Sequence, residues 1–406
     1  MTLNETPTSN RVHIGIFGKA NSGKSTFMNA LTGQQVSITA DIAGTTTDLV
    51  YKPMEIYPLG PCVIIDTAGF NDKGPLGKSR IEKTKLAAEK SDIAVILISA
   101  EEIYEGRDFK ETIVEELEWY QFFKERNTPV LFVINKSDLS RRAEDFKRKT
   151  EEITGEKTVI VSSATRKGME EFKNTLCQIY SSSENRTITG NLVSEEDTVL
   201  LVMPQDIQAP KGRLILPQVQ TIRELLDKKC IVISVTTDKF EMALQSLKQS
   251  PKLIITDSQV FDFVYKHKPE DSMLTSFSVL FAALKGDMDY YLQGAKKIDT
   301  LTKDSRVLIA ECCTHAPLNE DIGREKIPKM LRKRVGEELI IDIVSGADFP
   351  EDLSDYDLII QCGACMFNRK YVMSRIARAK EQKIPMTNYG VVIAHMTGIL
   401  EKIQTK

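Results

Sequence analysis

A glycine-rich run, GKANSGKS at residues 18–25, follows a short apolar stretch and precedes a helix-like segment. The order of strand, glycine loop and helix is typical of a phosphate-binding loop, with an ordinary strand-to-helix turn as the alternative. Glycines let backbone N–H groups approach phosphate oxygens, and the helix N-terminus adds positive potential. We expect Lys24 to reach the β- and γ-phosphates and the Ser25 hydroxyl to bind Mg²⁺. The residues expected to contact a nucleotide here are Gly18, Asn21, Ser22, Gly23, Lys24, Ser25 and Thr26.

Two further stretches fit the γ-phosphate end of such a site. DTAG at residues 66–69 closes an apolar run, which places the Asp66 carboxylate to hold Mg²⁺ through water and the Gly69 N–H to sense the γ-phosphate. AGTTTD at residues 43–48 lies where a switch loop belongs, and Thr46 is the threonine that we expect on Mg²⁺. The expected catalytic residues are therefore Lys24, Thr46, Asp66 and Gly69.

A third group of residues fits the recognition of a guanine base. NKSD at residues 135–138 closes another apolar run, and the Asp138 carboxylate is placed to accept two N–H bonds that adenine cannot offer. Lys136 would lie over the base, and the run 162–164 would present a backbone N–H to the guanine oxygen. The expected base-site residues are Asn135, Lys136, Asp138, Ser162, Ser163 and Ala164.

Each stretch taken singly could be a turn or a loop, but their order over residues 8–182 resembles the translation-factor-class GTPases of the TrmE and Era kind. The resemblance implies hydrolysis of GTP to GDP and phosphate. Phe70 stands where Ras-like enzymes carry a glutamine that orients water. Asn21 stands where TrmE-type enzymes hold K⁺, so we expect K⁺ to stimulate turnover by neutralising phosphate charge. The alternative for Asn21 is a turn residue with left-handed φ.

Cysteines gather at the ends of two strands expected at residues 307–311 and 357–361. Side chains alternate along a strand, so Cys313 and His315 should point to one side and Cys312 to the other. The thiolates of Cys313, Cys362 and Cys365 can then converge. Such a set suits an iron–sulfur cluster or zinc, and a Cys-x-x-Cys pair alone also suits thiol redox chemistry or packing.

The whole chain resembles the family of [FeFe]-hydrogenase maturation GTPases, with supporting stretches at residues 275–278, 284–287, 321–323 and 326–328. The resemblance implies a [4Fe–4S] cluster on Cys313, Cys362 and Cys365. It also implies a homodimeric scaffold and carrier that receives a di-iron precursor from two radical-SAM maturases and delivers it to apo-[FeFe]-hydrogenase. The expected cofactors are GTP, Mg²⁺, K⁺ and the cluster, and the di-iron precursor is cargo.

This sequence departs from the family pattern at one position, because Gln361 stands where a histidine ordinarily precedes the Cys-x-x-Cys pair. The fourth iron therefore has no obvious ligand. Candidates are Glu320, His315 or an exchangeable small molecule, and the short spacing from Cys313 disfavours His315. The alternatives are a solvated loop carboxylate for Glu320 and a hydrogen-bonding residue at a strand end for His315.

The elements that must hold these residues predict an α/β fold. Alternating apolar runs and helical patterns over residues 8–182 indicate a P-loop GTPase domain with a mainly parallel sheet, whose strand ends carry the motifs. A polar, turn-rich stretch at 181–197 separates it from a small α/β dimerisation domain at 195–268. An α/β cluster-binding domain should follow at 270–406.

Composition narrows the function classes. The net charge of the 406 residues is −3, and no apolar run approaches the ~18 residues that a membrane helix needs, so we expect neither nucleic acid nor a membrane as partner. The polar first residues predict a cytoplasmic protein with reduced cysteines, in which Cys62, Cys177 and Cys230 are buried thiols. No Cys-x-x-x-Cys-x-x-Cys run is present, so radical chemistry must come from partners.

Two other functions remain open from the sequence. The first is an Era-like GTPase of RNA or ribosome assembly with a zinc-binding tail, although the C-terminal half has no Gly-x-x-Gly loop and no basic stripe. The second is a redox enzyme that uses the cluster for electron transfer, although no flavin or nicotinamide fingerprint is visible.

Overall fold

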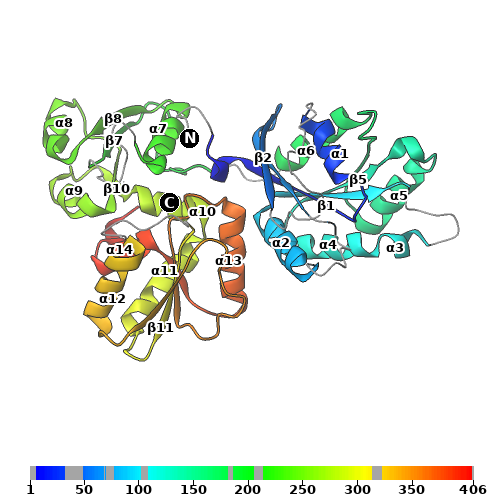
Figure 1. Cartoon of the computed structure of the whole chain (residues 1–406). Coiled ribbons are helices and arrows are strands. Elements are labelled where there is room, and N and C mark those ends of the chain that lie inside the picture. Colours follow the sequence, from blue (N-terminus) through cyan, green and yellow to red (C-terminus); the bar gives the residue numbers. More distant parts are fainter. Residues whose placement is uncertain are drawn as a thin grey trace. The chain divides into compact units, whose positions relative to one another are not determined.

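The computed structural model describes residues 6–32, 49–67, 69, 77–101, 108–181, 186–204, 214–312 and 322–404. The chain divides into two compact units, residues 1–184 and 185–406, and each is described by itself. Figure 1 shows both units as α/β structures in which helices cover sheets.

The first unit is built on one sheet with the strand order β2-β3-β1-β4-β5-β6. Every neighbouring pair is parallel except β2 with β3, which confirms the mainly parallel sheet. The strands are β1 (Val12–Gly18), β2 (Val50–Ile56), β3 (Gly60–Asp66), β4 (Ile93–Ser99), β5 (Val130–Asn135) and β6 (Thr158–Ile160).

Helices cover both faces of this sheet, as a parallel sheet requires. The helices are α1 (Lys24–Thr32), α2 (Gly77–Lys90), α3 (Phe109–Thr112), α4 (Val114–Glu125), α5 (Ala143–Thr154) and α6 (Met169–Ser181). Apolar side chains of α1 and α6 pack with Ile14 and Ile16 of β1 on one face. Those of α2 to α5 pack with Phe17 of the same strand on the other face. The alternation of side chains along β1 therefore supplies both cores.

The second unit contains two four-stranded parallel sheets. The first has the order β10-β9-β7-β8, from β7 (Thr198–Val202), β8 (Ile231–Val235), β9 (Leu253–Thr256) and β10 (Met273–Ser276). Its helices are α7 (Leu216–Asp227), α8 (Phe240–Ser246), α9 (Phe261–His267) and α10 (Phe277–Lys285). This sheet thus includes a strand beyond residue 268, where the sequence places the end of the central domain; the domain ranges stay a prediction.

The second sheet of this unit has the order β12-β11-β13-β14. Its strands are β11 (Arg306–Ala310), β12 (Ile340–Val344), β13 (Leu358–Gln361) and β14 (Met386–Asn388), and its helices are α11 (Met288–Lys296), α12 (Ile327–Val335), α13 (Arg369–Glu381) and α14 (Tyr389–Met396). The two central strands, β11 and β13, are direct neighbours, with Ala310 opposite Gln361. The chain segments that leave them therefore start side by side.

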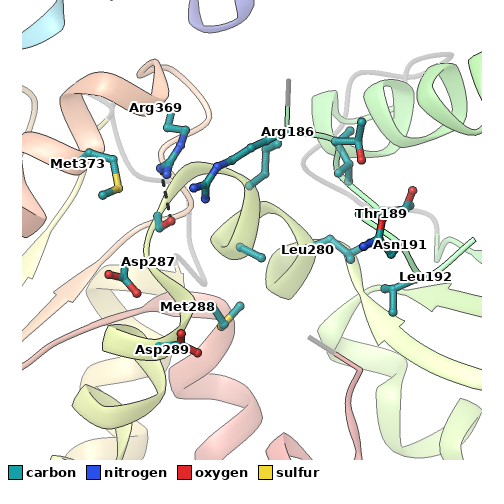
Figure 2. Close-up of a pocket in the computed structure, with 16 residues that line it drawn as sticks. Arg186, Thr189, Asn191, Leu192, Leu280, Asp287, Met288, Asp289, Arg369 and Met373 are labelled. Carbon is teal, nitrogen blue, oxygen red and sulfur yellow. Dashed lines mark hydrogen bonds between the residues drawn. The ribbon is translucent and has the colours of Figure 1, made fainter. Parts of the chain in front are cut away.

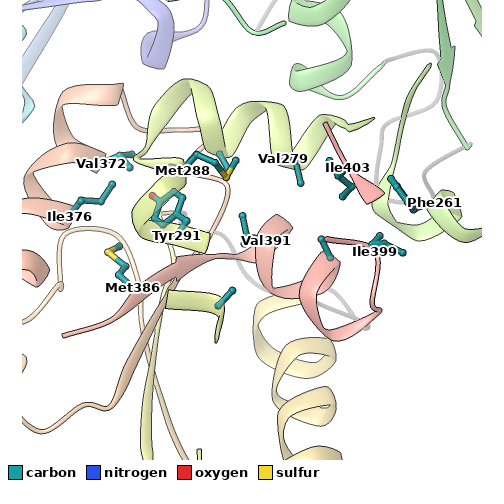
Figure 3. Packing of buried hydrophobic residues seen from close by; sticks show 14 of the residues in the cluster. Phe261, Val279, Met288, Tyr291, Val372, Ile376, Met386, Val391, Ile399 and Ile403 are labelled. Atoms are coloured by element: carbon teal, nitrogen blue, oxygen red, sulfur yellow. The ribbon is translucent and has the colours of Figure 1, made fainter. Parts of the chain in front are cut away.

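One apolar core joins the two sheets of the second unit. It includes Val279 of α10, Tyr291 of α11, Val372 of α13 and Val391 of α14, and Figure 3 shows these side chains turned toward a common interior. Other α10 side chains, including Leu280, pack in a separate core against the first sheet. Helix α10 is thus apolar on most sides, which is typical of a helix buried between layers.

In the part of the chain that the structure describes, no helix is long and apolar enough to cross a membrane.

A close contact between α11 and β14 gives a test of this core. A Cβ added to Gly294 would lie 2.1 Å from the Met386 backbone oxygen, which cannot move as a side chain can. Overpacking of this kind costs about 1–3 kcal/mol, whereas alanine in a helix regains about 1 kcal/mol. We expect Gly294→Ala to lower the free energy of unfolding, measured by urea denaturation followed by circular dichroism. Gly363→Ala, where a Cβ meets open space, is the control; equal stability of both variants would contradict this packing.

Candidate functional site

The loop between β1 and α1 has the shape that its glycines predict. Gly23 has φ +90°, and a Cβ there would lie 2.4 Å from the side-chain nitrogen of Asn135, so no other residue fits. Asn21 has φ 64°, the left-handed conformation that its turn alternative predicts. Ser25 and Thr26 lie in the first turn of α1, where free backbone N–H groups can face an anion.

Lys24 and Asp66 stand at this loop as the sequence predicts. The Lys24 ammonium donates to the backbone oxygens of Gly18 at 2.9 Å and Lys19 at 2.7 Å. Phosphate oxygens can replace these carbonyl acceptors without moving the lysine backbone. Burial raises the pKa of Asp66, and the cations Lys52 and Lys24 oppose that rise. A nearby divalent cation would favour the Asp66 carboxylate in the same way.

The DTAG glycine also lies against the phosphate-binding loop. A Cβ on Gly69 would lie 2.6 Å from the Ala20 backbone nitrogen, so these two backbones approach closely. A buried ion pair fixes the other side of the loop, because Lys19 lies 3.1 Å from the Glu116 carboxylate of α4. Burial raises the pKa of Glu116, and Lys19 opposes the rise. No motif links Lys19 with Glu116, so this pair could not be found from the sequence.

Asn135 joins three loops. Its side chain is fully buried, and its amide nitrogen donates to the Ser22 backbone oxygen at 2.9 Å. Its amide oxygen accepts from the Ser163 hydroxyl at 2.7 Å and from the Ser163 N–H at 3.2 Å. A single side chain therefore holds the phosphate-binding loop and the two base-site runs, 135–138 and 162–164, in fixed positions relative to one another.

The remaining expected base-site residues follow the ends of β5 and β6. Asp138 is exposed, and the buried Ser162 hydroxyl donates to its carboxylate at 2.6 Å. Lys136 adopts φ 57°, and its ammonium pairs with Glu101 at 2.7 Å. Ala164 follows Ser163 on the exposed surface. The Ser162 hydroxyl, which follows a different strand, thus orients the Asp138 carboxylate. A carboxylate that accepts two specific hydrogen bonds must be oriented in this way.

Three features expected in this unit lie outside the described residues. They are Thr46, Phe70 and most of the two expected switch loops at residues 34–48 and 70–78. The Mg²⁺ role of Thr46 therefore stays a prediction.

The second candidate site lies where β11 and β13 end. Cys312 follows β11 closely, and Cys362 follows β13 directly. The Cys362 sulfur accepts from the Cys312 N–H at 3.1 Å and from the Ala364 N–H at 3.4 Å. The neighbouring Cys312 thiol and these N–H groups lower the pKa of Cys362, whereas burial opposes the shift. Backbone N–H donors around a sulfur favour its thiolate form.

Cys312 itself is buried in the core of the unit, and the Gln361 amide nitrogen donates to its sulfur at 3.2 Å. Gln361 is fully buried, and among the described residues its amide oxygen has no hydrogen-bond partner. Gln361 therefore supports the strand end instead of reaching outward as a ligand.

A buried lysine underlies the Cys-x-x-Cys turn. Lys285, the last residue of α10, is only 6% exposed, and its ammonium donates to the backbone oxygens of Ala364 at 2.7 Å and Phe367 at 2.9 Å. Burial lowers the pKa of Lys285, and Cys365, Cys312 and Cys362 in their charged form oppose this. Lys285 has no role among the expectations drawn from the sequence, where the signal for one is a lysine that ends an otherwise apolar helix.

The expected ligand set is only partly within the described residues. Cys362 and the exposed Cys365 are described, whereas Cys313, His315 and Glu320 fall in the gap at 313–321. Among the residues on either side of that gap, no three His, Cys, Asp or Glu side chains form a metal-sized group. The donors present nevertheless fit an anionic metal–thiolate group, because a buried ammonium faces the cysteines and N–H groups point at the Cys362 sulfur.

A cavity of about 670 Å³ is lined by residues 186–192, by the end of α10 with residues 286–289, and by Arg369 and Met373. Figure 2 shows Arg369 donating to the Gly286 backbone oxygen, a bond of 3.4 Å, with Arg186 beside it and Asp287 and Asp289 below. Asp287 pairs with Lys380 at 2.6 Å. The lining thus mixes both signs of charge and defines no single class of ligand.

The Ser162–Asp138 bond generates a test of the base site. Ser162→Ala removes a hydrogen bond that orients the carboxylate, which should weaken GDP binding about fivefold, or about 1 kcal/mol. The dissociation constant of a fluorescent GDP analogue measures this directly. Ser140→Ala, which removes a hydroxyl bonded only to the nearby Arg142 N–H, is the matched control. Equal affinity of both variants would show that Ser162 does not position Asp138.

Family models match three successive parts of the chain. The 50S ribosome-binding GTPase model matches residues 13–136. The dimerization domain of hydrogen maturase F matches residues 188–286, and the tetramerization domain of the same maturase matches residues 289–405.

Curated relatives match the chain over less than half of its length. The tRNA modification GTPase MnmE of Chromobacterium violaceum is 36% identical over 172 residues, which cover 41% of this chain and 34% of that protein. MnmE of Aquifex aeolicus is 30% identical over 190 residues, or 47% and 39% of the two chains. GTPase Der of Wolinella succinogenes is 31% identical over 202 residues, or 47% and 40%. This chain thus spans between a third and two fifths of each of these relatives.

The relatives named here are GTPases, whereas the two maturase domains match residues 188–286 and 289–405 of this chain. A GTPase domain followed by both maturase domains in one polypeptide places this chain in the HydF family of hydrogen maturases.

Proposed function

We propose that this protein is a GTP-hydrolysing scaffold and carrier in the maturation of [FeFe]-hydrogenase. It holds a [4Fe–4S] cluster on Cys313, Cys362 and Cys365, receives a di-iron precursor and delivers it to the apo-hydrogenase. The observation that carries the proposal is the Cys-x-x-Cys turn at the end of β13, beside the end of β11 that leads to Cys313, within a maturase domain.

The nucleotide site supports a switch role for GTP. Lys24 rests on loop carbonyls that phosphate oxygens can replace. In the sequence, the expected switch loops at 34–48 and 70–78 follow α1 and Gly69. Nucleotide state then changes the affinity for partners, and it does not drive bond formation in the cargo. K⁺ near Asn21 supplies the positive charge that an arginine finger supplies elsewhere.

The partners follow from the same proposal. Two radical-SAM maturases build the di-iron precursor, since this sequence carries no radical-SAM cysteine run. The matched domains are named for dimerization and tetramerization, which supports assembly of this chain with copies of itself. The zinc-binding tail of the alternative, an RNA assembly GTPase, is disfavoured because the residues of that tail match a maturase domain.

Cluster binding is tested with one cysteine variant and one matched control. Cys362→Ser removes a central thiolate, so anaerobically reconstituted protein should lose iron, lose its visible absorption and fail to activate apo-hydrogenase after loading with a di-iron precursor. Cys177→Ser changes a cysteine of α6 in the GTPase unit and should leave all three readouts unchanged. A colourless wild-type protein that holds zinc and no iron would contradict the cluster.

The cation requirement is tested on the GTPase reaction. Hydrolysis should run at least ~10-fold faster in K⁺ than in Na⁺ buffer. A positive charge that is placed to stabilise the transition state raises the reaction rate on that scale. Asn21→Ala should abolish the difference. Asn127→Ala is the control. Asn127 has φ 49°, similar to the 64° of Asn21, but it lies in another turn. Equal wild-type rates in the two buffers would refute the K⁺ role.

A further inference from the structure

Hydrogen bonds donated by each segment to the other connect the turn that carries Cys362 and Cys365 with the end of α10. The Lys285 ammonium donates to the oxygens of Ala364 and Phe367 in the turn. In return, the Arg369 guanidinium donates to the Lys285 oxygen at 3.1 Å and to the Gly286 oxygen at 3.4 Å. Ala364 is buried and has φ 51°, a left-handed conformation that costs a non-glycine residue energy and that these contacts hold.

Hydrogen bonds to two carbonyls do not by themselves account for a buried ammonium. Moving such an ion out of water costs several kcal/mol unless an opposite charge compensates it. Within the described ranges, no carboxylate forms an ion pair with Lys285, and its buried ammonium instead bonds to the backbone of the turn that carries Cys362 and Cys365. An anionic metal–thiolate group on these cysteines would supply the opposite charge that this lysine lacks.

We propose that Lys285 is the internal counter-cation of the iron–sulfur cluster, a positioning residue that raises the reduction potential of the cluster and fixes the turn that binds it. This inference rests on the proposed function, because it presupposes a cluster on these cysteines. A fixed positive charge favours the more negative, reduced form, and net charge and hydrogen bonding around the sulfurs are what tune cluster potentials.

The proposal assigns the cluster environment to two domains. Lys285 lies in the segment that matches the dimerization domain, at 188–286, whereas the cysteine turn lies in the segment that matches the tetramerization domain, at 289–405. Helix α10 also packs against both sheets of the unit. A movement of α10 would therefore change the distance between the ammonium and the thiolates.

A purely structural role for Lys285 makes a different prediction. If the lysine only clamped the turn, a neutral donor of similar length would preserve the potential of any cluster that still assembled. Lys285→Gln keeps an N–H donor and removes the charge, Lys285→Met removes both, and Lys285→Arg keeps the charge. Lys380→Gln removes an exposed lysine of α13 that pairs with Asp287, and serves as the control for charge at the surface.

The experiment is an EPR-monitored redox titration of the full-length anaerobic proteins, with iron content and circular dichroism measured on the same samples. Lys285→Gln should lower the midpoint potential by at least 59 mV. For a one-electron couple, this shift corresponds to a tenfold change in the ratio of reduced to oxidised cluster. Lys285→Met should shift it equally or more, while Lys285→Arg and Lys380→Gln should stay near the wild-type value.

Unchanged potential in Lys285→Gln or Lys285→Met with full iron content would overturn the counter-cation and leave the proposed function intact. Wild-type protein without iron would overturn the proposed function and this inference together. If both neutral variants fold but retain no iron while Lys285→Arg retains it, the requirement for charge at this position is supported by the iron content itself.

Discussion

Parallel pairing decides where this protein can do chemistry. Strands that run the same way end at the same edge of a sheet, so loops distant in sequence leave from adjacent points. In the first unit this brings Gly18, Asp66 and Asn135 to one edge. In the second unit it places the chain after β11 beside the chain after β13. Both candidate sites follow from the same geometric constraint.

The two candidate sites also have similar electrostatic arrangements. Each candidate site is proposed to hold a strongly negative group, and each combines backbone N–H donors with one lysine that donates to carbonyl oxygens. Lys24 rests on Gly18 and Lys19 in the same way that Lys285 rests on Ala364 and Phe367. The difference is burial, because Lys285 closes an apolar helix between two sheets and is shielded from the solvent that would screen its charge.

Sequence patterns predicted β1, β3, β4 and β5 closely, because each is a long apolar run that ends at a motif. They missed the edge strand β2, whose exposed alternating residues include Pro53, and the short β10. They did not reveal that the buried Asn135 side chain bonds to both Ser22 and Ser163. They could not reveal the burial of Lys285, since a lysine at a helix C-terminus ordinarily lies in solvent and complements the helix dipole. Burial depends on contacts between distant segments.

On the proposed function, the cysteine turn after β13 and the chain after β11 hold iron together. Anomalous X-ray diffraction from crystals grown without oxygen, recorded on both sides of the iron absorption edge, shows whether they do. We expect a compact iron peak within bonding distance of the sulfurs of Cys362, Cys365 and Cys313, on the side of the turn that faces Lys285. A peak that appears only at the zinc edge, or an iron peak that contacts none of these sulfurs, would contradict it.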